Sequence, residues 1–389
     1  MDGVTSKALV VSLSDLRKDP RVTREIDWLA SEGWTVDSLG LGSKPTSTMR
    51  DHFEMARLAK WANSLVGKGL IHSFLPYAKR FNLLIESRIP REVSDRVRRG
   101  EYDLVLFNDL YFMPWISNKA TFSPQRNTRA HLDLHEFHPP ELAAGSSWRF
   151  LVNGYYRWQR RFVGSPRFRS RSVVANGIAD LYAEEFGVPK PTVIRNAPPY
   201  TEQPPSPVNP DRIELLFHGT AAWPRGLNQL IEAVRQLDAR FALTFMLTGP
   251  QDIVAELRTM VEDLGDRVTF AAPVAMGDVT SAINAYDLEV MFYPPTTDNL
   301  RFALPNKLFE AVQGRLGIVI GASPMMAEII EQYSNGIIAD GWEAKDLATA
   351  LNGLTPSHVV AMKAASALAA QELNAEREKE SFLRSIQSQ

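Results

Sequence analysis

The sequence predicts an α/β protein built from two doubly wound, Rossmann-like domains. The chain has 389 residues, which is long for one domain and enough for two domains that each bury a core. Short apolar runs alternate with amphipathic stretches, which is the pattern of repeated βα units around a parallel sheet. A proline-rich tract at residues 201–210 separates two such series and predicts a linker or domain edge.

The first series of elements precedes the proline-rich tract. A helix is expected from about Val22 until Gly33, because glycine commonly ends a helix. Residues 54–99 are expected to be helical and mix apolar with basic side chains. Strands are expected at residues 7–13, 35–39, 102–108, 130–134 and 172–175, and a further helix at 176–186.

The second series follows the tract. Its strands are expected at residues 213–217, 241–247, 268–270, 288–293 and 317–320. Residues 294–304 are not expected to form regular helix, whereas Pro305 introduces one. Residues 358–386 predict one or two helices. The expected domains are 1–200 and 201–371, with residues 372–389 returning to complete the first.

The composition is that of an ordinary soluble globular protein, with 44% apolar and 23% charged residues. The absence of cysteine excludes disulfides, thiolate metal sites and a cysteine nucleophile. There is no basic and apolar leader, and no apolar run reaches membrane-spanning length. We expect a cytoplasmic protein, with a peripheral position at the inner face of the membrane as a further hypothesis.

Charge is divided unevenly along the chain. Residues 1–195 carry 29 Lys+Arg and 21 Asp+Glu, whereas residues 196–389 carry 14 and 24. The basic tract from Trp148 to Arg171 interleaves arginines with aromatic residues and holds no acidic residue. It suits either a solvated face or an anionic surface, namely a membrane or a phosphate-bearing acceptor. A nucleic-acid partner is not expected, because no RNA- or DNA-binding motif accompanies the tract.

A candidate phosphate site follows the first strand of the second series. The residues there include Gly219, Thr220 and Arg225, and a helical run comes next. A glycine lets backbone approach a ligand, and a cation at a helix start suits a diphosphate. The alternative is an ordinary strand-to-helix turn with a surface arginine.

A second candidate region follows the strand at residues 288–293. The helix introduced by Pro305 carries Asn306, Lys307 and Glu310 in its first turns. Lys307 and Glu310 are three residues apart and so share a helix face. The lysine could bind diphosphate while the glutamate accepts both ribose hydroxyls. The alternative is a surface ion pair between the two side chains.

Five short motifs, in order along the chain, resemble the GT-B glycosyltransferases of glycosyltransferase family 4, especially bacterial members from surface-polysaccharide pathways. The most specific are PNKLFE at residues 305–310 and DPRVTRE at residues 19–25. Less specific are DLHE at 133–136, RNAP at 195–198, and the pair of dipeptides at 218–219 and 225–226. The resemblance extends over most of the chain and implies two domains that face a cleft.

The resemblance implies transfer of a sugar from a nucleotide diphosphate sugar, UDP- or GDP-linked, to a glycan or lipid-linked acceptor. Anomeric configuration would be retained. In such a site Glu310 would hold the ribose, while Arg225, Lys307 and the N–H groups after Gly219 would neutralise the diphosphate. No cofactor is expected, and the lack of a convincing DxD motif agrees with a reaction that needs no metal.

Residues of the first domain are expected on the acceptor side. The resemblance implies that His135 contacts the transferred sugar and that Glu136 either orients it or touches the acceptor. Asp19, Arg21 and Arg24 lie where an acceptor or a donor phosphate would approach. A capping network at the helix start, involving Asp19, Arg24 and Glu25, is the alternative.

One position departs from the family pattern. Many members carry an acidic residue eight positions before the ribose glutamate, where this chain has Phe302. The role of reading the sugar would then pass to Asp298 or Asn299, or to backbone at the helix start. Two other functions stay open: a nucleotide-sugar epimerase on the same fold, and a catalytically silent nucleotide-sugar-binding partner.

Overall fold

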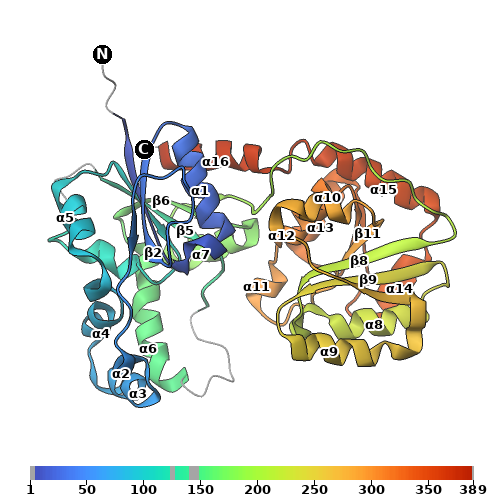
Figure 1. The fold of residues 1–389 in the computed structure, drawn as a ribbon, viewed down its shortest axis with the longest axis horizontal. Coiled ribbons are helices and arrows are strands. Elements are labelled where there is room, and N and C mark those ends of the chain that lie inside the picture. The colour runs from blue at the N-terminus through green and yellow to red at the C-terminus, as the bar shows by residue number, and fades with distance from the viewer. Residues whose placement is uncertain (1–4, 123–127, 140–148, 388–389) are drawn as a thin grey trace. The chain divides into compact units, whose positions relative to one another are not determined.

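A computed structural model describes residues 5–122, 128–139 and 149–387 of the chain. It forms two compact units, drawn largely in blue and green and in yellow to red (Figure 1). The first unit comprises Met1–Val174, Ile178–Ile194 and Ser381–Gln389, and the second comprises Ala175–Gly177 and Arg195–Glu380. The division therefore falls at Ile194 instead of residue 200, and the chain rejoins the first unit at Ser381 instead of residue 372.

The first unit is built on a parallel sheet. Among the described residues this sheet has seven strands in the order β3-β2-β1-β4-β5-β6-β7. Residues 8–11 of β1 are fully buried and pair with β2 on one side and β4 on the other, which explains why this strand is an uninterrupted apolar run. The strands are β1 (Lys7–Asp15), β2 (Thr35–Leu41), β3 (His52–Glu54), β4 (Leu104–Asn108), β5 (Arg129–Leu134), β6 (Phe168–Val173) and β7 (Thr192–Val193).

Helices connect these strands. The helix α1 begins at Pro20, where the missing N–H of proline costs nothing, and the side chain of Asp19 caps it by accepting from the N–H of Val22 at 3.2 Å. This helix spans Pro20–Ser31. The other helices are α2 (Lys60–Asn63), α3 (Leu65–Phe74), α4 (Tyr77–Leu84), α5 (Arg91–Arg99), α6 (Arg149–Arg160) and α7 (Asn176–Phe186).

The second unit is also built on a parallel sheet. Its strands, within the described part of the chain, run in the order β10-β9-β8-β11-β12-β13. The strand β8 lies at the centre, and the chain order reverses between β8 and β11. The strands are β8 (Ile213–Thr220), β9 (Phe241–Thr248), β10 (Val268–Ala271), β11 (Leu288–Met291), β12 (Gly317–Ile320) and β13 (Gly336–Ile338).

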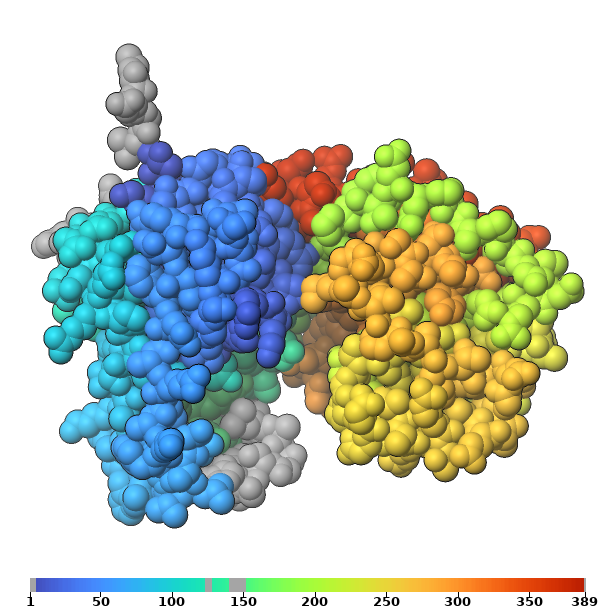
Figure 2. Space-filling model, in the orientation of Figure 1, coloured from blue at the N-terminus to red at the C-terminus, as the bar shows by residue number. Residues whose placement is uncertain are grey.

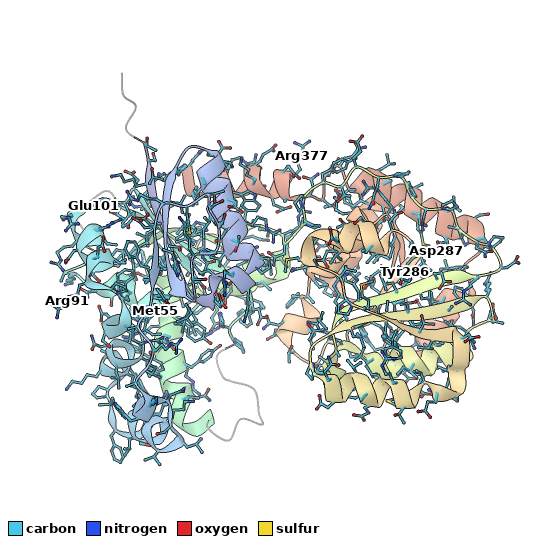
Figure 3. All side chains as sticks on the ribbon, viewed as in Figure 1. Met55, Arg91, Glu101, Tyr286, Asp287 and Arg377 are labelled. Atoms are coloured by element: carbon cyan, nitrogen blue, oxygen red, sulfur yellow. The ribbon has the colours of Figure 1, made fainter. Side chains whose placement is uncertain are left out.

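A buried ion pair joins the last helices of this unit to its sheet. Nζ of Lys363 donates to the carboxylate of Asp287 at 3.0 Å and to the carbonyl of Tyr286 at 2.7 Å, just before β11 (Figure 3). The helices are α8 (Leu227–Gln236), α9 (Gln251–Met260), α10 (Val279–Ile283), α11 (Asp298–Arg301), α12 (Asn306–Gln313), α13 (Pro324–Tyr333), α14 (Ala344–Asn352) and α15 (Pro356–Ala369).

The proline-rich tract is not a loose linker. The backbone N–H of Thr201 donates to the side chain of Gln313 at 2.9 Å, and Arg315 donates to the carbonyl of Gln203 at 3.1 Å. The hydroxyl of Ser206 donates to the carbonyl of Asn284 at 2.5 Å. The tract therefore belongs to the second unit, held by side chains that the local sequence does not identify.

The last two helices lead the chain from the second unit into the first. The helix α15 ends at Ala369, and α16 (Ala375–Gln387) carries the chain into the first unit. There Phe382 packs against Trp28 of α1, with ring centroids 5.5 Å apart, and Arg129 donates to the carbonyl of Ile386 at 2.9 Å. The end of the chain thus supports the first unit.

The short strands β3, β7 and β13 and the short helix α11 were not predicted. The strands β3, β7 and β13 have only two or three residues each, too few to show a hydrophobic period. The prediction that residues 294–304 contain no regular helix was wrong. The side chain of Thr297 accepts from the N–H of Leu300 at 3.2 Å and starts the single turn α11.

Candidate functional site

The chain reversal between β8 and β11 marks the candidate site of the second unit. In open parallel sheets, ligands bind beyond the carboxyl ends of strands at such a reversal. The end of β8 supplies His218 and Gly219, β11 contributes Glu289, and the helix α12 that follows β11 contributes Lys307 and Glu310. The two candidate regions of sequence thus lie together in space.

Gly219 and Lys307 are in tight contact. Gly219 has a φ of +102°, a backbone conformation that favours glycine. A β-carbon placed there would lie 2.4 Å from Cε and 2.9 Å from Nζ of Lys307. The glycine is therefore required both by its backbone angle and by the lysine stem that passes over it.

The amino group of Lys307 is buried without a hydrogen-bonded counter-ion among the described residues. Nζ has no hydrogen-bond partner among the residues that the structure describes, although it lies 4.1 Å from the ring centre of Phe217. The pKa of Lys307 is lowered to about 7. Burial is the main cause, the positive charge of Arg225 adds to it, and the negative charge of Glu289 opposes it. A buried ammonium without a hydrogen-bonded anion is unfavourable, so this position suits an incoming anionic group.

Arg225 stands at the turn between β8 and α8. It ends a short 3₁₀ helix (Trp223–Arg225), and Gly226 follows with a φ of +70°. A β-carbon at Gly226 would lie 1.9 Å from the carbonyl oxygen of Phe292, so this turn must approach the end of β11 closely. Arg225 is half-buried, and its charge acts on both Lys307 and Tyr293. The predicted second cation thus lies within electrostatic reach of the first.

Glu310 pairs with His218 rather than with Lys307. Nε2 of His218 lies 2.9 Å from Glu310, and Nδ1 lies 2.9 Å from the fully buried Glu289. Burial opposes protonation of His218, but the two carboxylates raise its pKa to about 9. The surface Lys/Glu pair that the helix spacing allowed does not form, because Lys307 is buried while Glu310 keeps about a fifth of its side chain exposed.

The other residues predicted to bind the donor lie at the end of β8, at the start of α12 and on α11. They differ in how far they are exposed to solvent. Thr220 is exposed at the end of β8, and Asn306 is the half-buried first residue of α12. Since Pro305 provides no side-chain cap, the first N–H groups of α12 lack the usual side-chain acceptor. Asp298 is exposed and Asn299 half-buried on α11. Phe302 follows directly after that turn.

In the first unit, Arg21 and Asp133 form a buried ion pair. Nε and Nη2 of Arg21 donate to the two carboxylate oxygens of Asp133 at 2.5 and 2.6 Å. Nη1 donates to the carbonyl of Ile194 at 2.7 Å. Burial would raise the pKa of Asp133, but the guanidinium of Arg21 holds it well below its usual value. Arg21 is 5% exposed, so its guanidinium is engaged inside the unit.

His135 lies directly after β5 and is held by three acidic or polar neighbours. Its Nε2 lies 3.0 Å from Asp133 and 3.0 Å from Oδ1 of Asn108, and its Nδ1 lies 3.4 Å from Asp109. Burial opposes the charge of His135, yet Asp109 and Asp133 together raise its pKa to about 9. About a fifth of the side chain is exposed, so a cationic imidazolium reaches the surface.

A strained residue and a tyrosine fix the loop that carries His135. Asp109 has a φ of 57°, unusual for a residue other than glycine, and its carboxylate accepts from the N–H of His135 at 3.2 Å. The hydroxyl of Tyr182 donates to the carbonyl of Glu136 and accepts from the N–H of His138, both at 2.9 Å. The side chain of Glu136 is exposed. The loop is therefore pinned while the Glu136 carboxylate faces solvent.

The other predicted acceptor-side residues lie at the start of α1. Asp19 caps the helix and also accepts from the hydroxyl of Ser14 at 2.8 Å. The guanidinium of Arg24, which is partly exposed, lies 5.9 Å from the ring centre of Trp28. Glu25 is buried, and burial together with the nearby Asp133 raises its pKa well above the usual value. A cap formed by Asp19 is thus present, whereas contact of these residues with an acceptor stays a prediction.

Much of the basic and aromatic tract is used within the protein. Arg160 binds the carboxylate of Glu185 and the carbonyl of His138. Arg171 is buried and donates to two backbone carbonyls, and Arg167 donates to the carbonyls of Ile116 and Phe122. Trp148 and the side chains of Arg149 and Phe150 lie outside the described residues. The tract is therefore a weaker candidate for an anionic surface than its composition indicated.

Several residues of these clusters were missed by sequence reasoning. Glu289 is a single acidic residue inside the apolar run LEVM, which is a signal for a buried charge with a partner. Asp109 follows the apolar run of β4 directly, as His135 follows that of β5. Tyr182 and Asn108 gave no such signal.

Among the described residues, no group of three or more His, Asp or Glu side chains is arranged to hold a metal ion.

Comparison with known proteins relates the second unit to a family and the chain to a fold. Residues 212–355 match the family model of glycosyl transferases group 1. This segment includes every predicted donor residue from Gly219 to Glu310. Among curated proteins, no match to the sequence was found.

Solved structures of similar fold cover almost the whole chain. A glycosyltransferase from Rickettsia africae is 13% identical with a TM-score of 0.66, covering 98% of this chain and 97% of its own. Sucrose-phosphate synthase from Thermosynechococcus elongatus is 16% identical with a TM-score of 0.70, covering 97% and 98%. Anabaena HepE, solved with UDP and glucose, is 18% identical with a TM-score of 0.64, covering 99% and 100%. The likeness confirms the predicted fold class, two parallel-sheet α/β domains of the GT-B type.

Proposed function

We propose that this protein is a glycosyltransferase that moves a sugar from a nucleotide diphosphate sugar to a glycan or lipid-linked acceptor. The observation that carries the proposal is the buried amino group of Lys307, which lies over Gly219 with no hydrogen-bond partner among the described residues. A diphosphate would supply the missing counter-charge. The match of residues 212–355 to glycosyl transferases group 1 supports this assignment.

In the proposed donor site, Lys307 and Arg225 neutralise the diphosphate, and the N–H groups after Gly219 and at Asn306 donate to its oxygens. Glu310 accepts the ribose hydroxyls through its partly exposed carboxylate. As the bond between C1 of the sugar and the diphosphate oxygen breaks, the leaving group gains negative charge that the two cations stabilise. Stabilisation by side chains and backbone agrees with transfer that needs neither metal nor cofactor.

His135 is proposed to contact the transferred sugar. Its imidazolium, held by Asp109 and Asp133, offers a partly exposed positive charge with a fixed orientation. In the transfer step an acceptor hydroxyl passes its proton to the departing diphosphate and its oxygen bonds to C1, with retained configuration as in the resembling family 4 enzymes. Glu136 is exposed beside His135 and is proposed to contact the acceptor.

The finer assignments are part of the same proposal. We infer a UDP- or GDP-linked donor, a role in bacterial surface-polysaccharide synthesis and a cytoplasmic location. The sequence motifs support these assignments, and the Anabaena neighbour was solved with UDP and glucose. With Phe302 at the position where many family members are acidic, Asp298, Asn299 and Thr220 are proposed to contribute to recognition of the donor.

The proposal is tested by a thermal-shift screen followed by a transfer assay. UDP, GDP, ADP, CMP, dTDP and their sugars are compared, because a ligand that binds the native state raises its apparent stability. The nucleotide sugar with the largest shift is then incubated with a broad acceptor panel. We expect a glycosylated product and release of the nucleoside diphosphate.

Three outcomes would contradict the proposal. Release of an isomerised sugar or nucleotide sugar without any acceptor would identify an epimerase. Binding with neither transfer nor donor hydrolysis would identify a silent binding partner. A shift that is unchanged in both Lys307→Ala and Glu310→Ala would move the donor site elsewhere.

A further inference from the structure

An exposed apolar surface lies on the first unit, on residues that are not assigned to catalysis. The chain leaves β3 at the buried Met55 (Figure 3) and forms α2, α3 and α4, which we call the helical arm, residues 60–84. Figure 1 shows α2 and α3 below α4, at the end of the unit opposite the N-terminus. In Figure 2 the same segment, in lighter blue, forms the lower end of the unit.

The helix α3 is apolar on two sides. Its inner side holds Ile71, which is 1% exposed, and Gly67, where a β-carbon would lie 1.8 Å from the carbonyl oxygen of Trp61 in α2. Its outer side exposes large apolar side chains to solvent. An apolar outer side needs a second apolar environment beyond the one that the inner side already packs against. The exposed fractions are Leu65 71%, Val66 73%, Leu70 51% and Phe74 78%, with Trp61 at 55% on α2.

The arm is firmly attached to the unit. Tyr77 of α4 packs against Tyr155 and Trp158 of α6, with ring centroids 6.3 Å apart in each pair. A β-carbon at Gly154 would lie 2.2 Å from the hydroxyl of Tyr77, so this glycine allows the close packing. Phe81 adds a further contact with Trp158. The exposed apolar side chains therefore project from a packed base.

The charge of the arm has one sign. Between Met55 and Ile85 the sequence contains five Lys or Arg residues and no Asp or Glu. One of the five, Arg80, is buried and donates to the carbonyl of Leu75 at 2.6 Å. The other four are exposed: Arg57, Lys60, Lys68 and Lys79. Apolar side chains bordered by cations suit a surface that is apolar inside and anionic outside.

We infer that the helical arm is a docking surface for an anionic lipid bilayer. The apolar side chains of α3 enter the boundary between head groups and acyl chains, while the four exposed cations meet the anionic head groups. Trp61 has the amphipathic ring that favours this interface, and it is 55% exposed. A second copy of the chain fits less well, because a two-fold contact would bring the cations of both copies together. The inference does not depend on the proposed transfer reaction.

Co-sedimentation of the full chain with vesicles tests the inference. Vesicles of phosphatidylcholine alone are compared with vesicles that also contain phosphatidylglycerol. We expect binding to the anionic vesicles, and a loss of about tenfold or more in the double variant Leu65→Ser/Phe74→Ser. The matched control is Val360→Ser/Leu368→Ser, which removes two apolar side chains on α15 that are 53% and 70% exposed.

Charge is tested separately. The triple variant Lys60→Gln/Lys68→Gln/Lys79→Gln is expected to lose binding to the anionic vesicles at low salt, because each lysine near the surface adds attraction. Replacing three exposed lysines elsewhere, Lys44, Lys119 and Lys345, leaves the overall charge equally reduced and is expected to preserve binding.

A reporter makes the result independent of the stability of these variants. Since the chain has no cysteine, Leu70→Cys and Leu368→Cys each give a single labelling site for an environment-sensitive fluorophore. We expect the label at position 70 to shift to the blue with anionic vesicles and the label at position 368 to stay unchanged.

Equal response of the two labels, or equal binding to both kinds of vesicle, would overturn the inference. So would concentration-dependent self-association that Leu65→Ser/Phe74→Ser abolishes, which would identify the arm as a contact between copies.

Discussion

Lys307 of α12 crosses Gly219 so closely that a β-carbon at position 219 would lie 2.4 Å from Cε of the lysine. The end of β8 and the start of α12 therefore pack directly against each other, beside the point where the strand order reverses. This contact sets the position of a buried amino group that has no hydrogen-bond partner among the described side and main chains.

Gly219→Ala is expected to weaken binding of the nucleoside diphosphate about tenfold or more, because the new methyl group displaces Lys307 and strains the backbone. Gly33→Ala is the matched control. Gly33 also has a positive φ, of +81°, but open space around its β-carbon position. Thermal-shift titration measures both. If the two variants lost binding equally, backbone strain alone would explain the loss, and displacement of Lys307 would not be its cause.

Lys307→Met is expected to abolish diphosphate binding and to change how stability depends on pH. The pKa of Lys307 is lowered to about 7 from its ordinary 10.5, so between these values the unfolded chain binds more protons than the folded one. Stability of the wild type therefore gains from rising pH in this window. The thermal midpoint of Lys307→Met should exceed that of the wild type more at pH 6 than at pH 10. A constant difference would show that the amine titrates normally.

Glu310→Gln is expected to separate ribose from diphosphate recognition. The variant should bind nucleoside diphosphates about tenfold or more weakly, because a neutral amide accepts the two hydroxyls less well. Its affinity for inorganic pyrophosphate should be nearly unchanged. Calorimetric titration with both ligands gives the comparison, and parallel losses would place Glu310 in support of the whole site.

Asp133→Asn is expected to cost about 3–5 kcal/mol of stability, because it removes the charge of the carboxylate that accepts two hydrogen bonds from the buried guanidinium of Arg21. Chemical denaturation monitored within the first unit measures the change. Asp95→Asn, which removes one partner of the exposed pair with Arg98, serves as the control and should change little. A similarly small effect at Asp133 would mean that water replaces the lost partner.

His135→Gln is expected to reduce stability most at low pH. The pKa of His135 is raised from 6.5 to about 9, so its ion pairs contribute fully below about pH 6.5 and are lost as the pH rises through 9. The difference in thermal midpoint between wild type and variant should shrink across that range. NMR titration of the imidazole gives the pKa directly, and a value near 6.5 would contradict the prediction.

The strands of both sheets were largely predictable. Parallel strands buried on both faces must be apolar throughout, so runs such as those of β1 and β8 stand out in the sequence. Helix spacing likewise predicted that Lys307 and Glu310 share a face. Short edge strands and the turn α11 left no comparable pattern, because their hydrogen bonds depend on neighbours rather than on a hydrophobic period.

The pairing of charges was decided by the tertiary structure alone. Glu310 meets His218 from 92 positions away and Arg21 meets Asp133 from 112, distances at which local spacing carries no information. The same holds for Arg160, whose carboxylate partner Glu185 removes it from the surface that its basic tract indicated. Sequence thus determined which residues carry charge and which segments are buried. Only the folded chain determined which charges are paired inside it and which, like that of Lys307, have no hydrogen-bond partner among the described residues, because pairing depends on distance in space.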